Sequence, residues 1–208
     1  MEIEKAYNLW ASQYDSGINK TRDLEAIAFR ACLENIQFRT CLEIGCGTGK
    51  NTKWLIEKVE KLTAVDFSEK MLAQARQKIS SEKVNFQQAD VTQKWHFAST
   101  LYELISCSLV LEHIENLHQV FKEASKNVIF NGYLYVGELH PFKQYSGSKA
   151  RFNTAEGEQV LTCFTHHLSD YLEAAKSNGF RLLEVKEHFD NNDRKSLPRI
   201  LTLLFQKH

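Results

Sequence analysis

The chain has 208 residues, and its 26 Lys and Arg balance its 26 Asp and Glu, so the formal charge is zero. This length suits one domain with extensions and a sizeable core. Nucleic-acid-binding proteins usually carry a basic excess, so the balance disfavours stable nucleic-acid binding, apart from a local patch. The composition is 43% hydrophobic and 25% charged, with 9 Gly and 2 Pro, which excludes collagen-like and low-complexity classes.

The cysteines and the N-terminus indicate the compartment. Five cysteines, an odd number without C-x-x-C spacing, disfavour a disulfide framework or a zinc cluster. The N-terminus is polar, and no segment approaches 18 consecutive apolar residues. We therefore expect a cytoplasmic protein with no membrane contact.

The first 35 residues predict two helices separated by a turn at 15–19. Apolar residues recur at helical spacing in two groups: Ala6, Leu9, Trp10 and Tyr14, then Leu24, Ile27, Ala28, Ala31 and Cys32. Thr21 is the expected cap of the second helix, and Asp23 and Glu25 suit its positive end.

From residue 40 the pattern alternates between strands and helices. The predicted strands are 41–44, 62–65, 84–86, 101–108 and 133–136, and the predicted helices are 51–59, 68–79 and 117–127. Such alternation predicts a parallel, doubly wound α/β sheet.

The C-terminal part follows another pattern. A helix is predicted at 171–178, and strands at 182–185 and 200–205 can pair antiparallel at the sheet edge. Residues 140–168 read as an irregular stretch, and a gap of that length is usually functional.

The strongest motif is Glu43-Ile44-Gly45-Cys46-Gly47-Thr48-Gly49, between a predicted strand and a predicted helix. Small residues let the backbone turn sharply and approach a ligand, and in an open α/β sheet ligands bind at the carboxyl ends of the strands. The dinucleotide fingerprint G-x-G-x-x-G needs a glycine at position 50, where this chain has Lys. A nicotinamide-dependent oxidoreductase is therefore disfavoured.

The motif resembles motif I of the class I S-adenosylmethionine-dependent methyltransferases. The resemblance extends over about residues 7–206: Asp66 follows Gly45 by 21 positions, Asp90 follows the third strand, and 106–114 and 178–180 match later motifs of the small-molecule, methyltransferase-domain-11/25-like enzymes. It implies a doubly wound, mostly parallel seven-stranded Rossmann-like sheet with an antiparallel last strand and an N-terminal helical lid. One domain is expected, divided into a lid (1–36), a cofactor-binding core (37–139), a substrate-cap insertion (140–168), and a C-terminal helix with edge strands (169–208).

The resemblance also implies residue roles. Asp66 would accept both ribose hydroxyls, Phe67 and Met71 would flank the adenine, and Asp90 with Val91 would receive its amine. The residues implied in cofactor binding are Tyr14, Arg22, Glu43, Gly45, Cys46, Gly47, Gly49, Asp66, Phe67, Met71, Asp90, Val91 and Ser106. Simpler interpretations stay open: Trp10 and Tyr14 also fit the apolar face of a helix, and Met71 also fits the core.

Some methyl acceptors are disfavoured by the segment after the fourth strand. Ser106-Cys107-Ser108-Leu109 lacks the Pro-Pro-Tyr-like residues of DNA and protein-amide enzymes, and Cys107 lacks the preceding Pro of cytosine C5 enzymes. Glu112-His113-x-x-Asn116 differs from H-E-x-x-H, and the adjacent His166 and His167 need not point the same way. No metal is expected.

The predicted insertion is rich in aromatic residues and histidines, which suits a small flat or amine-bearing acceptor. His140 and His166 are the candidate general bases, and Trp10, His113, Tyr145 and His167 are the candidate substrate contacts. The expected function is methyl transfer from S-adenosylmethionine to O, N or an electron-rich C of a metabolite, by a monomer or homodimer. The alternatives are a tRNA or rRNA methyltransferase and a non-catalytic cofactor-binding subunit.

Overall fold

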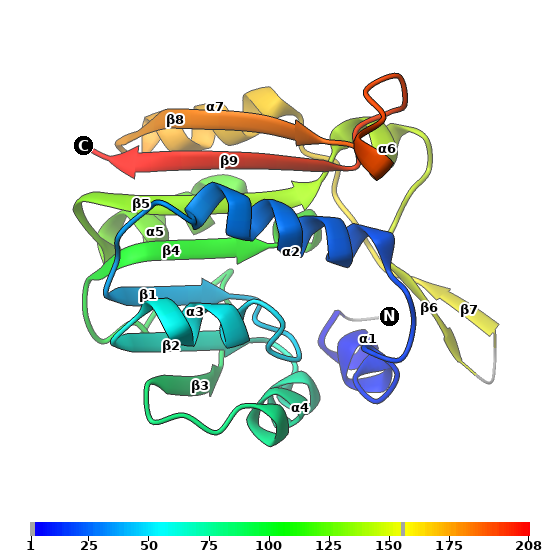
Figure 1. Ribbon diagram of the computed structural model, residues 1–208, viewed down its shortest axis with the longest axis horizontal. Coiled ribbons are helices and arrows are strands. Elements are labelled where there is room, and N and C mark those ends of the chain that lie inside the picture. Colours follow the sequence, from blue (N-terminus) through cyan, green and yellow to red (C-terminus); the bar gives the residue numbers. More distant parts are fainter. Residues whose placement is uncertain (1–2, 155–156) are drawn as a thin grey trace.

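A computed structural model describes residues 3–154 and 157–208 (Figure 1). Within this part of the chain, seven strands form one sheet in the order β3-β2-β1-β4-β5-β9-β8. Its strands are β1 (Thr40–Ile44), β2 (Lys61–Asp66), β3 (Val84–Gln88), β4 (Tyr102–Ser108), β5 (Val128–Leu139), β8 (Phe180–His188) and β9 (Ile200–Lys207). The strands β1 to β5 pair in parallel, and β9 is antiparallel to both of its neighbours. The predicted sheet and its antiparallel last strand are confirmed.

Helices cover both faces of the sheet. In Figure 1, α2 and α3 lie in front of the strands, and α5 and α7 lie behind them. The helices are α1 (Ile3–Trp10), α2 (Lys20–Leu33), α3 (Thr52–Lys58), α4 (Glu69–Lys78), α5 (Leu117–Asn127), α6 (Pro141–Tyr145) and α7 (Leu168–Ser177), and short 3-10 turns η1 (Leu111–His113) and η2 (Asp190–Asn192) complete the described elements. No described helix is long and apolar enough to cross a membrane.

Each face of the sheet has its own core, because neighbouring strand residues point to opposite faces. Leu104 on β4 packs in the core with Phe29 of α2, whereas the next residue, Ile105, packs in the core with Phe121 of α5. Both faces are covered, so the central strands are apolar along their length. This burial holds the carboxyl ends of β1, β2 and β4 at one edge, where the site lies.

The predictions for the N-terminus need two corrections. Tyr14 was expected on the first helix, but α1 ends at Trp10 and Tyr14 lies in the following turn. The cap of α2 is Asn19 rather than Thr21, because the Asn19 side chain is the one that accepts a hydrogen bond from the Arg22 N–H, at 3.0 Å.

The segment 140–168, expected to be irregular, contains ordered elements. It holds α6 and a two-stranded hairpin of β6 (Arg151–Thr154) and β7 (Gly157–Val160). The indole of Trp10 stacks on the ring of Phe152 at 5.1 Å, which ties α1 to this hairpin. The expected lid and the expected substrate cap are therefore in contact.

Candidate functional site

The glycine turn after β1 requires glycine for steric reasons. Gly45, Gly47 and Gly49 all have positive φ, at 70°, 53° and 88°. A Cβ on Gly45 would lie 1.9 Å from Cγ2 of Val110, which follows β4. The backbone N–H groups of Gly45 and Cys46 donate to the Val65 carbonyl. The turn is thus fixed to β2 and packed against the turn after β4.

Asp66 ends β2 and faces the glycine turn. Its carboxylate accepts hydrogen bonds from the backbone N–H groups of Gly47 and Ser68, both at 2.8 Å. Burial raises the pKa of Asp66 to about 6, against the opposing effect of these hydrogen bonds. The Asp66 carboxylate therefore holds the glycine turn in place and also borders the cavity in which a ligand can bind.

A cavity of about 490 Å³, the first cavity, lies at the carboxyl ends of the strands. Nine of the predicted site residues line it: Tyr14, Gly45, Gly47, Asp66, Phe67, Met71, Asp90, Val91 and His113. Met71 is fully buried and also borders the cavity, so it belongs to the core, and its contact with the adenine stays a prediction that its position allows. The motifs predicted from distant positions therefore meet in one place.

A second cavity of about 600 Å³ continues from the first, because Tyr14, Gly45 and Gly47 line both. It takes in four more of the predicted residues: Arg22, Glu43, Cys46 and Gly49. The Arg22 guanidinium lies over the Tyr14 ring at 4.0 Å, within cation–π range. Burial raises the pKa of Glu43 to about 8, although the Thr52 hydroxyl donates to its carboxylate at 2.6 Å.

Sequence reasoning missed a buried polar group that also lines the second cavity. Glu25, expected only to favour the positive end of α2, accepts hydrogen bonds from Asn51 at 3.1 Å and from the Tyr135 hydroxyl at 3.2 Å. Burial raises its pKa. Oδ1 of Asn51 is buried and has no hydrogen-bond partner among the described residues. Apart from its acidic residue type, no local signal could have revealed that Glu25 points inward.

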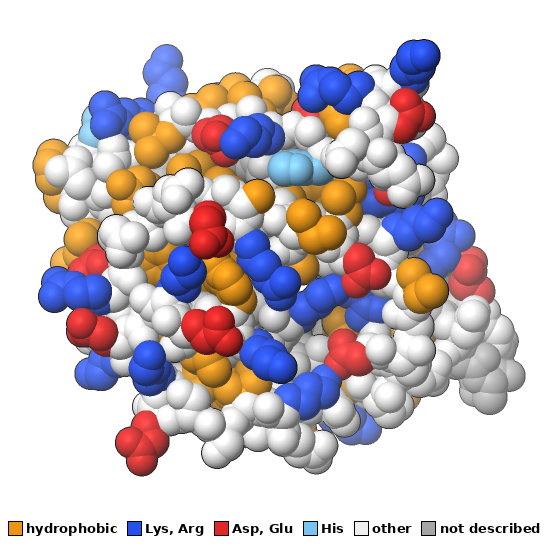
Figure 2. Space-filling model, viewed as in Figure 1, with side chains coloured by type: hydrophobic (Ala, Val, Ile, Leu, Met, Phe, Trp, Pro, Cys, Tyr) orange, Lys and Arg blue, Asp and Glu red, His pale blue; other side chains and the backbone are white. Residues whose placement is uncertain are grey.

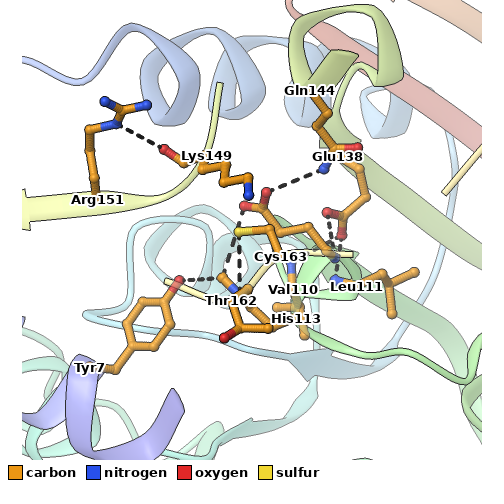
Figure 3. Close-up of polar contacts among 11 residues, drawn as sticks. Tyr7, Val110, Leu111, His113, Glu138, Gln144, Lys149, Arg151, Thr162 and Cys163 are labelled. Carbon is orange, nitrogen blue, oxygen red and sulfur yellow. Dashed lines mark hydrogen bonds and ion pairs between the residues drawn. The ribbon is translucent and has the colours of Figure 1, made fainter. Parts of the chain in front are cut away.

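The opposite wall of the first cavity carries Tyr7 and His113. The Tyr7 hydroxyl lies 2.8 Å from Nε2 of His113, and Nδ1 of His113 lies 3.0 Å from the Thr162 carbonyl oxygen (Figure 3). Since a carbonyl only accepts, Nδ1 carries the proton and Nε2 accepts from Tyr7. Burial raises the pKa of Tyr7 far above its ordinary value. Tyr7 was not predicted, because its partner is 106 residues away.

Trp10 and Glu112 border a third cavity of about 320 Å³. It shares Tyr7 with the first cavity, Arg22 with the second, and Tyr14 with both. Trp10 therefore lines this third cavity, beside the hairpin. Ser106, a predicted cofactor contact, is buried in β4 and lines none of these three cavities.

The structure does not bring the two candidate bases to the cleft. Nε2 of His140 lies 3.1 Å from Glu187, its Nδ1 accepts from the Phe142 N–H, and it borders a separate cavity together with Tyr145. Nε2 of His166 lies 2.8 Å from the buried Ile114 carbonyl. His167 and Tyr145, both predicted substrate contacts, hydrogen-bond to each other through Nδ1 of His167 and the Tyr145 hydroxyl, and neither lines the first cavity. Hydrogen bonds to residues 47, 52 and 22 positions away along the chain hold His140, His166 and His167 where they lie.

Comparison with known proteins gives a consistent result. Residues 42–136 match the family described as methyltransferase domain. The malonyl-[acyl-carrier protein] O-methyltransferase of Priestia megaterium is 28% identical over 89% of this chain and 69% of its own. The structure of an S-adenosylmethionine-dependent methyltransferase from Clostridium acetobutylicum superposes with a TM-score of 0.70 at 18% identity, over 98% of both chains. The N-methyltransferase NodS of Bradyrhizobium japonicum, in complex with S-adenosyl-L-homocysteine, gives 0.72 at 16% identity, over 98% of this chain and 97% of that one.

The family match covers β1 to β5, the part that carries the glycine turn and Asp66. The solved structures share the fold over almost the whole chain, N-terminal helices included. With its motifs gathered at the carboxyl edge of the sheet, the chain belongs to the class I S-adenosylmethionine-dependent methyltransferases.

Proposed function

We propose that the protein transfers the methyl group of S-adenosylmethionine to a small molecule bound between the glycine turn and the Tyr7–His113 wall. The observation that carries this is the continuity of the first and second cavities through Gly45 and Gly47. An extended ligand can lie along both cavities with its centre at the glycine turn. The first cavity is also lined by Tyr7 and His113, which belong to none of the cofactor motifs and leave room for an acceptor.

The residues present fit the cofactor. Asp66 offers two carboxylate oxygens to the ribose hydroxyls, and Asp90 with Val91 borders the place for the adenine amine between Phe67 and Met71. At the other end, the orphaned Oδ1 of Asn51 and the carboxylates of Glu25 and Glu43 suit an ammonium group. Arg22 borders the same cavity and suits a carboxylate.

The bound cofactor supplies a methyl group on a sulfonium, which needs no further activation. The chain therefore has to align the acceptor and exclude water. Tyr7, Tyr14 and Trp10 form an aromatic wall, with Tyr7–Trp10 rings 5.8 Å apart and Trp10–Tyr14 rings 4.9 Å apart. His113 presents Nε2 to this space and can take a proton from an acceptor once Tyr7 turns away. We therefore place the proton acceptor at His113 rather than at His140 or His166.

Small acceptors suit the size and charge of the site. The first cavity holds about 490 Å³, within the usual range of small-ligand sites. On the face shown in Figure 2, Lys and Arg side chains alternate with Asp and Glu side chains, which does not favour a polyanion. The names of the relatives include O- and N-methyltransferases, so both oxygen and nitrogen stay open as acceptor atoms.

The remaining expectations become part of the proposal. We retain the division into a lid (1–36), a cofactor-binding core (37–139), a cap (140–168) and a C-terminal part (169–208). The five cysteines are all unpaired, which suits a reducing cytoplasm. A monomer or homodimer without nucleic acid is the proposed working form.

Labelled methyl incorporation tests the function. Purified protein and S-adenosylmethionine with a labelled methyl group are incubated with a small-molecule extract and, separately, with total RNA. We expect label in a metabolite, and none with the Asp66→Asn variant. Label only in RNA would contradict the small-molecule proposal. Cofactor binding without label in either pool would favour a non-catalytic subunit.

A further inference from the structure

Three metal-binding side chains from two distant parts of the chain meet beside the first cavity. One ligand atom each of Glu112, His113 and Cys163 lies within 4.8 Å of the other two. Sγ of Cys163 is 3.9 Å from Nδ1 of His113, and Oε1 of Glu112 is 3.9 Å from Nε2. Figure 3 shows His113 and Cys163 of this Glu112–His113–Cys163 cluster where η1 meets the segment that follows β7.

The backbone on both sides of Cys163 is fixed to the turn that carries the other two donors. The Phe164 N–H donates to the Glu112 carbonyl at 2.7 Å, and the Thr162 carbonyl accepts from Nδ1 of His113 at 3.0 Å. The turn is held in its own right, because the buried Glu138 carboxylate accepts the backbone N–H groups of 110, 111 and 112. The donors are therefore held close together before any ligand arrives.

His113 has the orientation of a metal-bound imidazole. Metal-ligating histidines commonly donate the other ring N–H to a backbone carbonyl or carboxylate, which fixes the tautomer. Here Nδ1–H donates to Thr162 and leaves the Nε2 lone pair directed towards Glu112 and the first cavity, whereas the 3.9 Å contact of the Cys163 sulfur is with Nδ1. The Tyr7 hydroxyl now occupies that lone pair at 2.8 Å, so the Tyr7 side chain must turn away when a ligand binds there.

Glu112 is a buried carboxylate without a strong cation beside it. It is 6% exposed, and among the described residues His113, whose ring is neutral in this hydrogen-bonding arrangement, is the only basic side chain within ion-pair distance. Lys149 appears near the cluster in Figure 3 but makes no ion pair with Glu112. The hydrogen bonds to the Glu112 side chain come from the weakly donating Cys163 thiol and, at 3.5 Å, from the Gln144 amide. A buried carboxylate with so little compensation is unfavourable unless a positive ligand joins it.

We propose that Glu112, His113 and Cys163 bind a divalent cation of the zinc class, with an open coordination position facing the first cavity. Imidazole, thiolate and carboxylate are the ligands that Zn²⁺ takes, and three protein ligands with one open position characterise catalytic zinc sites. On binding, the Cys163 thiol releases its proton to the solvent and the sulfur ligates the cation.

The open position gives the site a role in the proposed reaction, and this role rests on the proposed function. With the cation bound, His113 would serve as a ligand, and a hydroxyl or thiol acceptor on the open position would lose its proton to the solvent more readily; without the cation, His113 is the base as proposed above. Metal binding itself needs neither the cofactor nor the acceptor. The two proposals can therefore fail separately.

Titration of the full chain with Zn²⁺ and Co²⁺ alone tests the site, after removal of metal with a chelator. We expect about one equivalent of Zn²⁺, and a thiolate-to-metal charge-transfer band with Co²⁺. Cys163→Ser should abolish the band and weaken Zn²⁺ binding by roughly tenfold or more. The matched control, Cys32→Ser on α2, should change neither. Tyr7→Phe should bind Zn²⁺ several-fold more tightly, because Nε2 of His113 is then free.

Two results would overturn the site. One is that the wild type and Tyr7→Phe both fail to bind Zn²⁺ with a Kd below about 100 µM. The other is that Cys163→Ser binds Zn²⁺ as tightly as the wild type. Circular dichroism confirms that each variant is folded, and His113→Gln provides a second variant with the same expected loss.

Discussion

The two walls of the cleft are built in different ways. The cofactor wall comes from short contiguous segments, the glycine turn and the end of β2, which face each other across neighbouring strands: Gly47 donates to Asp66 only 19 residues away. The acceptor wall joins α1, η1 and the end of the hairpin, with Tyr7 and His113 separated by 106 residues and Cys163 and His113 by 50. Substitutions in the cofactor wall should therefore change cofactor binding, and substitutions in the acceptor wall should leave cofactor binding nearly unchanged.

The largest effect is expected where the two walls touch. Gly45→Ala places a Cβ 1.9 Å from Cγ2 of Val110 at a φ of 70°. Overpacking and backbone strain together should cost about 3–5 kcal/mol of unfolding free energy, measured by urea denaturation. Gly47→Ala is the matched control, because its Cβ would meet nothing within 4 Å and only strain of about 1 kcal/mol remains.

A double variant sharpens this comparison. Val110→Ala removes the clashing methyl group, so in the Gly45→Ala background it should recover part of the lost stability. If Gly45→Ala and Gly47→Ala destabilise equally, backbone conformation alone limits the turn and the contact between the walls is unimportant.

The next effect lies in the cofactor wall. Asp66→Asn keeps the size of the side chain but removes the charge that strengthens its hydrogen bonds. S-Adenosyl-L-homocysteine binding should weaken by about 2–4 kcal/mol, measured by calorimetry. Asp90→Asn keeps an acceptor for the adenine amine, so its affinity should change less than about fivefold. Equal losses in the two variants would contradict the assignment of the ribose to Asp66.

The difference between the walls also explains what could be predicted from the sequence. The glycine turn, Asp66, and the alternation of strands and helices follow from local spacing in the sequence. The structure places the glycine turn and Asp66 at the carboxyl edge of one sheet. His140 shows the limit. Its residue type and position in the insertion suggested a base, but it caps α6 and pairs with Glu187, 47 residues later. Contacts of that range are set by how the elements pack, which residue patterns do not encode.

The pH dependence of cofactor binding offers a smaller effect with a definite sign. The pKa of Asp66 is raised from 3.8 to about 6. Its stabilising contribution to the free protein is complete below pH 3.8 and is lost as the pH rises towards 6. Cofactor binding needs the ionised form, so ionisation of Asp66 alone should raise affinity for S-adenosyl-L-homocysteine about tenfold between pH 5 and pH 7, in addition to any rise from Glu43, whose pKa is about 8. Stability and affinity therefore change in opposite directions over adjoining pH ranges.

Calorimetry across this pH range measures the affinity change, and Asp66→Asn is the control that should remove the Asp66 contribution and leave only the rise from Glu43. Affinity that falls with rising pH in the wild type would show that another group controls binding.

The smallest effect belongs to the acceptor wall. Tyr7→Phe removes the hydrogen bond to Nε2 of His113 and leaves the ring packed against Trp10. The unfolding free energy should fall by about 1 kcal/mol, and affinity for S-adenosyl-L-homocysteine should change less than about threefold. Tyr133→Phe is the control, because the Tyr133 hydroxyl makes no hydrogen bond among the described residues, and it should leave both quantities unchanged.

A tenfold loss of cofactor affinity in Tyr7→Phe would contradict the separation of the walls, because Tyr7 would then order the cofactor site through α1. The expected result has a mechanistic consequence. If the Tyr7 hydroxyl is held to His113 by a bond worth only about 1 kcal/mol, the Tyr7 side chain can turn away and return at little energetic cost, while α1 stays held by the stacking of Trp10 on Phe152. Entry of an acceptor, or of a cation at His113, then competes with a weak contact within the protein rather than with the packing of the sheet.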